Sequence, residues 1–581
     1  MCFDWYKKGG LMRYGKWIAV LLLILAGVGI YHNSLHSPLF WDDEETITKN
    51  VFVQSVRHIP DIFRNSYHAG SGITVAFYRP LTSLTFLWDY HFWKIKPFGY
   101  HLSNVLLHTG NAVLIFLFFG MVFRKKRIAF LSALLFLVHP LNSEAVNYVS
   151  NRTDLLMLFF FLLSFWSYVA YRREGKIPLL ALSFAGYICS VLSKEMGLVL
   201  PLFLLAYEGV VHKPLEISAL AVQAGGHTGR GKMKKMRQLE AKKRRPLWLI
   251  FLVFAAIIIG YTVLRSTVLN FTNANLITGG PGKIPFHKDP VVRFLTVSKG
   301  FVTYLKLFFL PINLHMEYDR PVIHSRWDPS GWLAVAVFCA AAALLFWWGR
   351  KSKDPKILFG ASWFFIGLLP VSGILVPLNN VVSEHYVYLS SAGFFLCAAV
   401  AAVELYDRSR LHWVRTVMVS AGIFLVAVLG AMTFRQNRVW SDPQEFFLHI
   451  TRITTGSFRA NNNAGMEYWK RGDMVKAEEY FRRSMEINPN YAVAVNNVGY
   501  IEDTHGNLEK AEQLYARAIW LDSTYLLAKR NLANIYIRMK KYTQAREQIQ
   551  DILKRYPYDQ QSRDLLKYIP PEFQVKPPSG P

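Results

Sequence analysis

Cysteine is scarce in this sequence of 581 residues, which contains Cys2, Cys189, Cys339 and Cys397. The last three lie inside apolar runs, and no two of the four form a CxxC pair. This spacing favours neither a disulfide framework nor a zinc site. Acidic residues are also few, since 39 Asp and Glu stand against 66 Lys and Arg.

The net charge of +27 is high enough for a nucleic-acid-binding protein, but the placement of the basic residues argues against one. They cluster in short links between apolar runs, and the longest link, 212–246, holds ten Lys and Arg against two Glu. Basic links of this kind mark the cytoplasmic ends of membrane spans. We therefore expect a lipid bilayer as partner, with headgroup contact at 230–245, and no nucleic acid.

Long apolar runs are the dominant feature, and 52% of the residues are hydrophobic. We expect about eleven spans, the first retained as a membrane helix and not cleaved as a signal peptide. They cover approximately 17–35, 101–123, 128–147, 154–171, 177–193, 196–211, 247–265, 331–349, 357–376, 386–404 and 416–434. The apolar run 294–310 carries Lys299 and Lys306, so it is expected to be an interfacial or re-entrant helix that does not cross.

After residue 435 the composition changes to that of a soluble helical array. Gly465 and Gly499 are 34 residues apart, and Ala477, Ala511 and Ala545 recur at the same interval. This is the period of tetratricopeptide (TPR) repeats, in which small residues lie where paired helices approach each other. Three such repeats reach the minimum for a stable stack.

The predicted fold is therefore all-α, a polytopic membrane helix bundle followed by a soluble TPR solenoid. The expected transmembrane domain, 1–434, includes an external subdomain at 36–98, a basic cytoplasmic loop at 212–246 and an external loop with an interfacial helix at 266–330. A linker at 435–457, three repeats at 458–559 and a tail at 560–581 follow. With residues 7–16 in the cytoplasm, alternation of the spans places the repeats on the opposite side.

Asp42 and Asp43 belong to an acidic run, 42–45, that follows the first span directly, behind Phe40 and Trp41. Carboxylates at the mouth of a membrane bundle are costly and point to function, although a loop carboxylate can also simply cap a helix. Transfer of a sugar from a lipid phosphate suits a single carboxylate, because the phosphate leaves as a stable anion and needs no general acid. The departing phosphate does need positive charge beside it, from Arg, Lys or a metal ion.

Further candidates for binding the donor phosphate or a substrate lie in loops and helix ends on the same predicted side. They are Arg79, His101, His139, Glu144, Arg152, Asp154, Lys194, Glu195, Glu384, His385 and Tyr388. Each has a structural alternative: Arg152 and Asp154 can cap a helix, Lys194 can snorkel, and His101 can make a helix contact. No residue is assigned as a metal ligand, and the question whether a divalent ion assists the phosphate stays open.

Several strings together resemble the transmembrane and tetratricopeptide-repeat (TMTC) proteins, members of the GT-C superfamily of membrane glycosyltransferases. The matching stretches are FWDDEETITKN (40–50), FYRPLTSLTFL (77–87), PFGYHLSNVLLH (97–108), HPLNSEAVNYVSNRTDLL (139–156), SKEMG (193–197) and EHYVYLSSAG (384–393). The resemblance implies a GT-C fold and inverting transfer of mannose or another hexose from a polyprenyl-phosphate donor to Ser or Thr of an exported protein. It assigns the base to Asp42 or Asp43, with Asp42, nearer the helix end, slightly preferred.

Other functions remain open at this point: transfer to a glycan or lipid acceptor, a transporter, or a membrane scaffold in which the repeats do all the binding. The ionisable residues gather at outer helix ends and no matching halves are visible, which disfavours a transporter. We expect an integral membrane protein of the bacterial inner membrane with the repeats in the periplasm, or of the endoplasmic reticulum with the repeats in the lumen. The repeats are expected to bind the acceptor protein or another partner.

Overall fold

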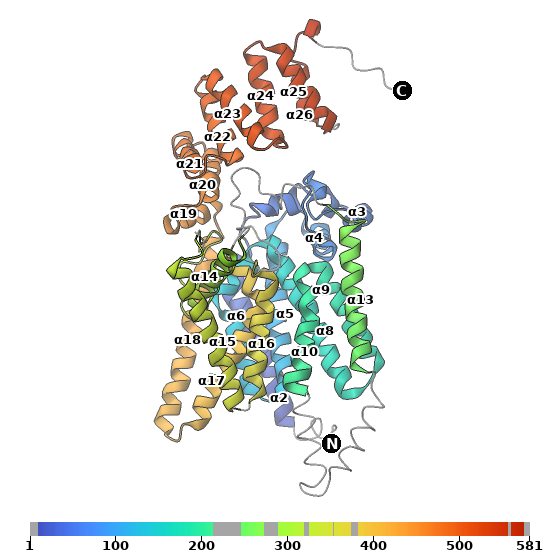
Figure 1. Cartoon of the computed structure of the whole chain (residues 1–581), viewed down its shortest axis with the longest axis vertical. Coiled ribbons are helices and arrows are strands. Elements are labelled where there is room, and N and C mark those ends of the chain that lie inside the picture. Colours follow the sequence, from blue (N-terminus) through green and yellow to red (C-terminus); the bar gives the residue numbers. More distant parts are fainter. Residues whose placement is uncertain are drawn as a thin grey trace. The chain divides into compact units, whose positions relative to one another are not determined.

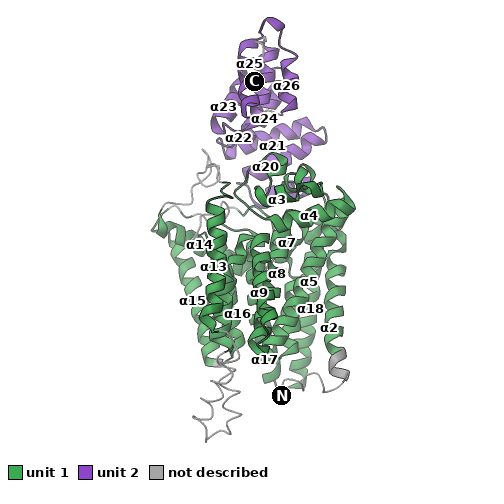
Figure 2. Ribbon diagram, turned by 90° about the vertical axis from the view of Figure 1, so that its right-hand side faces the viewer, with its two compact units in different colours: residues 1–273, 286–442 green, residues 274–285, 443–581 purple. Residues whose placement is uncertain are grey.

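The computed structural model describes residues 10–212, 246–271, 289–318, 323, 325–352, 354–373, 381–555 and 559–573. Every regular element among these residues is a helix (Figure 1). The chain divides into two compact units, one of residues 1–273 and 286–442 and the other of residues 274–285 and 443–581 (Figure 2). Most of the basic loop predicted at 212–246 lies outside the described residues.

Each of the eleven apolar stretches predicted as spans contains a helix of the first unit. They form α2 (Gly10–Tyr31), α5 (Pro97–Phe123), α6 (Lys126–Val138), α8 (Arg152–Glu174), α9 (Ile177–Ser193), α10 (Leu200–Ala206), α13 (Leu247–Ser266), α15 (Pro329–Ser352), α16 (Pro355–Leu368), α17 (Tyr388–Arg408) and α18 (His412–Val439). Within the described residues, eight helices are long and apolar enough to cross a membrane, or nine with the bent pair Lys126–Val138 and Pro140–Asn147. The all-α membrane fold is confirmed, whereas the count of eleven spans is not.

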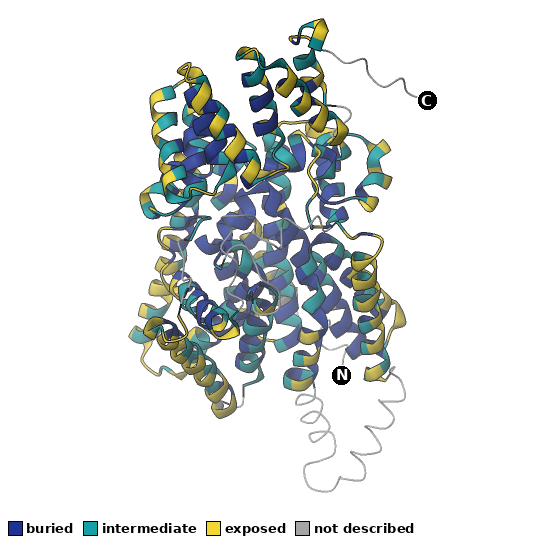
Figure 3. Cartoon of the chain, turned by 45° about the horizontal axis from the view of Figure 1, so that its top comes forward, coloured by how far each residue is buried: buried dark blue, intermediate teal, exposed yellow. Residues whose placement is uncertain are grey.

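Aromatic packing fills the centre of this bundle, where the most buried residues lie (Figure 3). Trp363 of α16 is 1% exposed and stacks on Phe165 of α8 with ring centroids 5.7 Å apart. Close approach of α16 and α17 depends on two glycines: a Cβ added to Gly393 would lie 2.5 Å from the carbonyl oxygen of Gly360. Small residues let membrane helices pack closely in this way, because lipid offers no hydrophobic drive for helix association.

The predicted external subdomain, 36–98, folds into short helices at one end of the bundle. They are η2 (Glu44–Thr48), η3 (Val51–Val53), η4 (Val56–His58), α3 (Ile59–Arg64), η5 (Ala69–Ser71) and α4 (Pro80–Trp93). A small core of their own, which includes Ile47, Ile62 and Phe86, holds them together and also takes in Tyr100 of α5. The subdomain is therefore ordered and attached to the bundle by shared burial.

Short helices in the loops at the same end of the bundle complete this surface. They are η1 (His32–Ser34), η6 (Pro140–Asn142), α7 (Ser143–Asn147), η7 (Val149–Asn151), η8 (Glu195–Val199), η10 (Leu369–Val371) and η11 (Glu384–Val387). Helix α14 (Pro290–Phe309), which contains the run predicted as interfacial, packs beside α15. It is not among the candidate membrane spans, and its interfacial placement stays a prediction.

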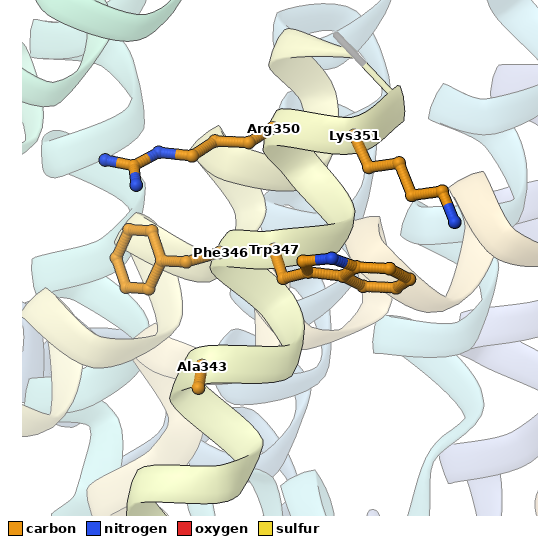
Figure 4. A pocket seen from close by; sticks show the side chains of 5 residues that line it. All are labelled: Ala343, Phe346, Trp347, Arg350 and Lys351. Atoms are coloured by element: carbon orange, nitrogen blue, oxygen red, sulfur yellow. The ribbon is translucent and has the colours of Figure 1, made fainter.

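The C-terminal end of α15 carries a shallow pocket of about 580 Å³. Ala343, Phe346, Trp347, Arg350 and Lys351 line it (Figure 4). The Lys351 ammonium lies 4.5 Å from the centroid of the Trp347 ring. Aromatic and basic side chains in this combination are typical of a helix end at a membrane interface. None of the candidate site residues lines this pocket.

The second unit is an array of antiparallel helix pairs. It consists of α19 (Pro443–Ile453), α20 (Phe458–Lys470), α21 (Met474–Ile487), α22 (Ala492–Thr504), α23 (Leu508–Leu521), α24 (Leu526–Arg538), α25 (Tyr542–Arg555), α26 (Gln560–Leu566) and η12 (Pro571–Phe573). Helix α20 pairs with α21, α22 with α23 and α24 with α25, as the repeat period predicts. Gly465 and Gly499 face Phe481 and Tyr515 of the paired helix, and a Cβ at either position would come within 3.0 Å of that ring.

Two segments differ from their description as linker and tail. The linker predicted at 435–457 is largely helical, because α18 continues to Val439 and α19 follows, packing on α20 with Phe446 and Ile450 buried. The tail predicted at 560–581 begins with α26, which packs on α25 and covers the end of the repeats. Residues 574–581 lie outside the described part of the chain.

Candidate functional site

The backbone turns sharply before the acidic run. Trp41 has φ +61°, in the left-handed region that bulky residues rarely occupy. Backbone strain of this kind costs about 1–3 kcal/mol and persists only where surrounding contacts over-determine it. Here the ring of Trp41 lies 6.1 Å from that of Tyr148, which in turn stacks on Trp440 at 5.7 Å. These contacts hold the backbone of Trp41 directly before Asp42, which begins the helical turn that leads into η2.

Asp43 points into the protein. It is 1% exposed, and its Oδ1 accepts hydrogen bonds from the backbone N–H and the hydroxyl of Ser150, at 2.8 and 2.6 Å. Burial raises the pKa of its carboxyl to about 7, although the two Ser150 bonds act in the opposite direction. Asp42 adds to the rise because it is a like charge beside a poorly solvated group.

Asp42 is exposed, in contrast to its neighbour. Its backbone N–H donates to the phenolic oxygen of Tyr148 at 3.2 Å, and its carboxylate also interacts with that phenol. The two adjacent acids therefore differ in environment: one is buried and tied to η7, and the other is open to an incoming molecule. A base that takes a proton from a substrate must be reachable, and Asp42 meets this condition.

Arg79 directly precedes α4, as the N-cap residue of that helix. Its Nε and Nη2 groups donate to the Glu195 carboxylate at 3.2 and 2.7 Å, and the guanidinium lies over Phe77 at 4.4 Å. Burial and Glu195 act oppositely on Arg79, and the net effect raises the pKa of the guanidinium. Burial raises the pKa of Tyr67, the charges of Arg79 and Arg152 lower it and those of Asp43 and Asp42 raise it, so all four groups lie within electrostatic range of this phenol.

A second ion pair lies beside the first. Lys194 donates to both oxygens of Asp154, at 2.8 and 2.7 Å, and both residues are at most 5% exposed. Tyr386 lies within electrostatic range of Asp154, Arg79 and Glu195. The predicted candidates Lys194 and Glu195 therefore belong to two neighbouring ion pairs. Tyr386 also lies within electrostatic range of Glu144, which belongs to the next cluster.

Three predicted residues meet at the N-terminal end of α17. His385 Nδ1 lies 2.5 Å from Oε1 of Glu144, and the backbone N–H of Glu384 donates to the other oxygen of Glu144 at 3.2 Å. The Glu384 carboxylate accepts a 2.6 Å hydrogen bond from Tyr318, a residue that the sequence analysis did not single out. Glu144 is fully buried and Glu384 is 2% exposed, whereas His385 and Tyr318 are partly exposed.

Arg152 does not have the open environment expected of a phosphate ligand. It is 1% exposed and pairs with Asp89 at 2.6 Å. Its guanidinium also donates to Asn104 at 2.8 Å and to the Tyr100 carbonyl at 2.9 Å, and lies over Phe86 at 4.4 Å. These contacts join α8 to α4 and α5.

Three further candidates are buried inside the bundle. His139 donates from Nε2 to the Phe308 carbonyl at 3.0 Å and accepts at Nδ1 from the Leu141 N–H at 3.2 Å. Tyr388 is fully buried, with its phenol 2.8 Å from His108 Nδ1. His101 is 1% exposed. The hydrogen bonds of His139 and Tyr388 are suited to holding helices together, whereas, among the described residues, both ring nitrogens of His101 are buried without a hydrogen-bond partner.

The residues that the sequence analysis missed are the partners of the acids. Tyr148 and Ser150 lie in the string 139–156, but nothing in their spacing showed that they would reach Asp42 and Asp43. Among the described residues, no group of three or more His, Cys, Asp and Glu side chains is arranged to hold a metal ion. Asp43, Glu144, Asp154 and Glu195 each accept hydrogen bonds from groups of the protein.

Taken together, the fold and the site define a class of protein: an integral membrane helix bundle with an acidic and basic cluster at one end, followed by a TPR array. Models of the tetratricopeptide repeat match residues 458–491 and 504–567, which confirms the predicted repeats. Among solved structures, the crystal structure of yeast Tom70 covers 81% of this chain and 94% of its own at 12% identity. Its TM-score of 0.20 is too low to inform the fold.

The resemblance to TMTC proteins is confirmed over about four-fifths of the chain. Protein O-mannosyl-transferase TMTC3 of Mus musculus is 26% identical over 487 residues, which are 81% of this chain and 51% of that protein. Tmtc3 of Drosophila melanogaster is 25% identical over 80% of this chain and 55% of its own. TMTC4 of Homo sapiens is 25% identical over 79% of this chain and 65% of its own. The chain spans about half the length of the TMTC3 relatives that it matches.

Proposed function

We propose that this protein is a membrane protein O-mannosyltransferase that uses a polyprenyl-phosphate mannose donor and transfers the sugar to Ser or Thr of an exported polypeptide. The site faces the side opposite the cytoplasm, which is the periplasm if the chain resides in a bacterial inner membrane. The names of the relatives support the activity. The observation that supports the mechanism is the contrast between exposed Asp42 and buried Asp43.

In the proposed reaction, Asp42 accepts the proton of the acceptor hydroxyl as its oxygen attacks the anomeric carbon of the sugar. The bond between that carbon and the phosphate oxygen breaks, and the lipid phosphate leaves with the electron pair. A single displacement of this kind inverts the anomeric configuration. The phosphate departs as a stable anion, so one carboxylate is sufficient.

Arg79 is the proposed partner of the donor phosphate. Glu195 engages its Nε and Nη2 groups on one edge of the guanidinium. A planar guanidinium has five N–H donors, and a phosphate that approaches the other edge can share it with Glu195. The carboxylate then serves to orient Arg79, while the positive charge stabilises the leaving group.

The test is a transfer assay with the purified full-length protein, labelled polyprenyl-phosphate mannose and a Ser- and Thr-rich polypeptide. The proposal predicts that sugar becomes attached to hydroxyl oxygens with inverted configuration, and that Asp42→Asn abolishes the reaction. Glu44→Gln is the matched control, because Glu44 belongs to the same acidic run but pairs with Lys49 at the surface. Absence of transfer by folded wild-type protein would contradict the proposal and favour a transporter or scaffold.

A further inference from the structure

Four polar side chains form a continuous hydrogen-bonded chain that begins at the buried acid of the pair. The Ser150 hydroxyl, in η7, lies 2.6 Å from Oδ1 of Asp43 and 3.2 Å from the hydroxyl of Thr46, in η2. The Thr46 hydroxyl in turn lies 3.1 Å from Nε2 of His68, the residue directly before η5. We call Asp43, Ser150, Thr46 and His68 the relay.

Burial differs along the relay. Asp43 and Thr46 are each 1% exposed and Ser150 is 8% exposed, whereas His68 is partly exposed. Among the described residues, no hydrogen bond reaches the other ring nitrogen of His68, Nδ1, and this atom is not enclosed. The imidazole is therefore the member of the relay that water can reach, and the three inner members connect it to the buried carboxyl.

The two hydroxyls of the relay can work in both directions, because a hydroxyl donates one proton and also accepts. When Asp43 carries a proton, each group donates to the next in the direction of His68, whose Nε2 accepts. When Asp43 is ionised, Nε2–H donates to Thr46 and every other bond reverses as well. The same atom positions satisfy both states, so no side chain has to move when a proton passes.

We propose that the relay carries protons between Asp43 and the water outside the subdomain. In the outward step, the Asp43 carboxyl gives its proton to the Ser150 oxygen. The hydroxyl proton of Ser150 passes to Thr46, and that of Thr46 passes to Nε2 of His68. The imidazolium formed in this way releases its Nδ1 proton to water. The carboxyl has then lost one proton, the water has gained it, and the hydroxyls and the imidazole are neutral again.

The two ends of the relay differ in their affinity for a proton. Burial raises the pKa of Asp43 to about 7, and burial together with the charge of Arg79 lowers the pKa of His68 to about 4. Near neutral pH the imidazole is therefore neutral and holds an additional proton only in transit, while Asp43 exchanges its own. The titratable groups around the two ends are Asp42, Tyr67 and Tyr148 at Asp43, and Arg79 and Glu45 at His68.

The relay gives the acid pair a second route for releasing a proton. In the proposed reaction, exposed Asp42 takes up the proton of the acceptor hydroxyl, which removes the like charge beside Asp43. The pKa of Asp43 then falls, and its proton leaves through the relay while the substrates still cover Asp42. This use of the relay rests on the proposed function, whereas proton exchange by Asp43 does not.

The experiment is a jump from about pH 6 to about pH 8 on the full-length protein in detergent, followed by time-resolved infrared absorption of protonated carboxyl groups. The signal of Asp43 is the part that is absent from Asp43→Asn. Thr46→Val should keep the size of this signal and slow its decay by about tenfold or more, because the proton then depends on local opening of the subdomain. Replacement of the outer member, His68→Leu, should slow the decay in the same way.

Two variants serve as controls for the loss of the hydroxyl. Thr46→Ser restores a hydroxyl at the same place and should decay like wild type. Thr48→Val should also decay like wild type, because the Thr48 hydroxyl donates to the Glu44 carbonyl in the same helix and lies outside the relay.

Three results would overturn the proposal. The first is an equally fast decay in wild type, Thr46→Val and His68→Leu at equal unfolding temperature, since the proton would then reach Asp43 by another route. The second is a slow decay in Thr46→Ser or Thr48→Val, which would indicate altered packing. The third is a wild-type signal with no part lost in Asp43→Asn. A relay that behaves as expected in a protein without sugar transfer would sustain this inference and refute only the proposed activity.

Discussion

Replacing Asp43 with asparagine should make the protein more stable at neutral and basic pH. The carboxyl of Asp43 is buried, and its pKa lies near 7 in the folded protein against an ordinary value of 3.8. A group whose pKa is raised on folding contributes stability below its unfolded pKa, and that stability is lost as the pH rises through the folded value. Ionised Asp43 is thus a cost to the folded state at pH 8, and asparagine removes it.

The size of the effect follows from the difference of about three pH units between the two pKa values of Asp43. Each pH unit corresponds to about 1.4 kcal/mol, so the cost of ionisation reaches about 4 kcal/mol above pH 7 and vanishes near pH 4. Asparagine keeps a carbonyl oxygen that can accept the two hydrogen bonds from Ser150. The substitution should therefore preserve the connection between the acidic run and η7.

The assay is thermal unfolding in detergent, followed by tryptophan fluorescence at several pH values between 4 and 8. Asp43→Asn should unfold at the same temperature as wild type near pH 4 and at a higher temperature at pH 8. Asp42→Asn should show a smaller gain at pH 8, because it removes only the repulsion between Asp42 and Asp43 and leaves Asp43 buried. A variant at position 43 that is destabilised equally at every pH would refute the reasoning and show that the carboxylate is needed in its charged form.

Further substitutions test other parts of the account. Arg152→Met should destabilise the protein by about 3–5 kcal/mol, because buried Asp89 loses its cation. A variant with unchanged stability that binds the donor more weakly would instead identify Arg152 as a ligand of the phosphate. Arg79→Lys should raise the KM for the donor about tenfold with little change in unfolding temperature, since lysine lacks the planar fork; an unchanged KM would exclude contact with the phosphate. Gly393→Ala should lower the yield of folded protein, because its Cβ would meet the Gly360 carbonyl, whereas Gly422→Ala, with open space around it, should not.

The sequence was sufficient to predict the helical spans and the repeats because their signals are local. Apolar runs and the 34-residue recurrence of glycine and alanine do not depend on tertiary contacts. The number of crossings could not be settled in the same way. Helices Ile177–Ser193 and Pro355–Val371 are apolar but shorter than the others, and the pair at 126–147 is bent by 59°, so length alone does not decide their role.

The candidate residues could be named from the sequence, but their contacts could not. The sequence shows two adjacent acids and cannot show that Asp43 points inward to Ser150 while Asp42 stays exposed, since that depends on the strained turn at Trp41. For the same reason Arg79 and Arg152 look equivalent in sequence. Their burial and their partners distinguish them. Arg79 pairs with partly exposed Glu195, whereas Arg152 pairs with Asp89 in the interior.

The most direct measurement is the rate of mannose transfer by Asp42→Asn and Asp43→Asn, compared with wild type at saturating donor and acceptor. We predict that Asp42→Asn lowers kcat by about 10²–10⁴-fold, as expected for the loss of a general base, while Asp43→Asn retains most of the activity. Both variants should unfold no earlier than wild type at pH 8. Loss of activity in Asp43→Asn alone, with full activity in Asp42→Asn, would contradict the assignment of Asp42 as the base.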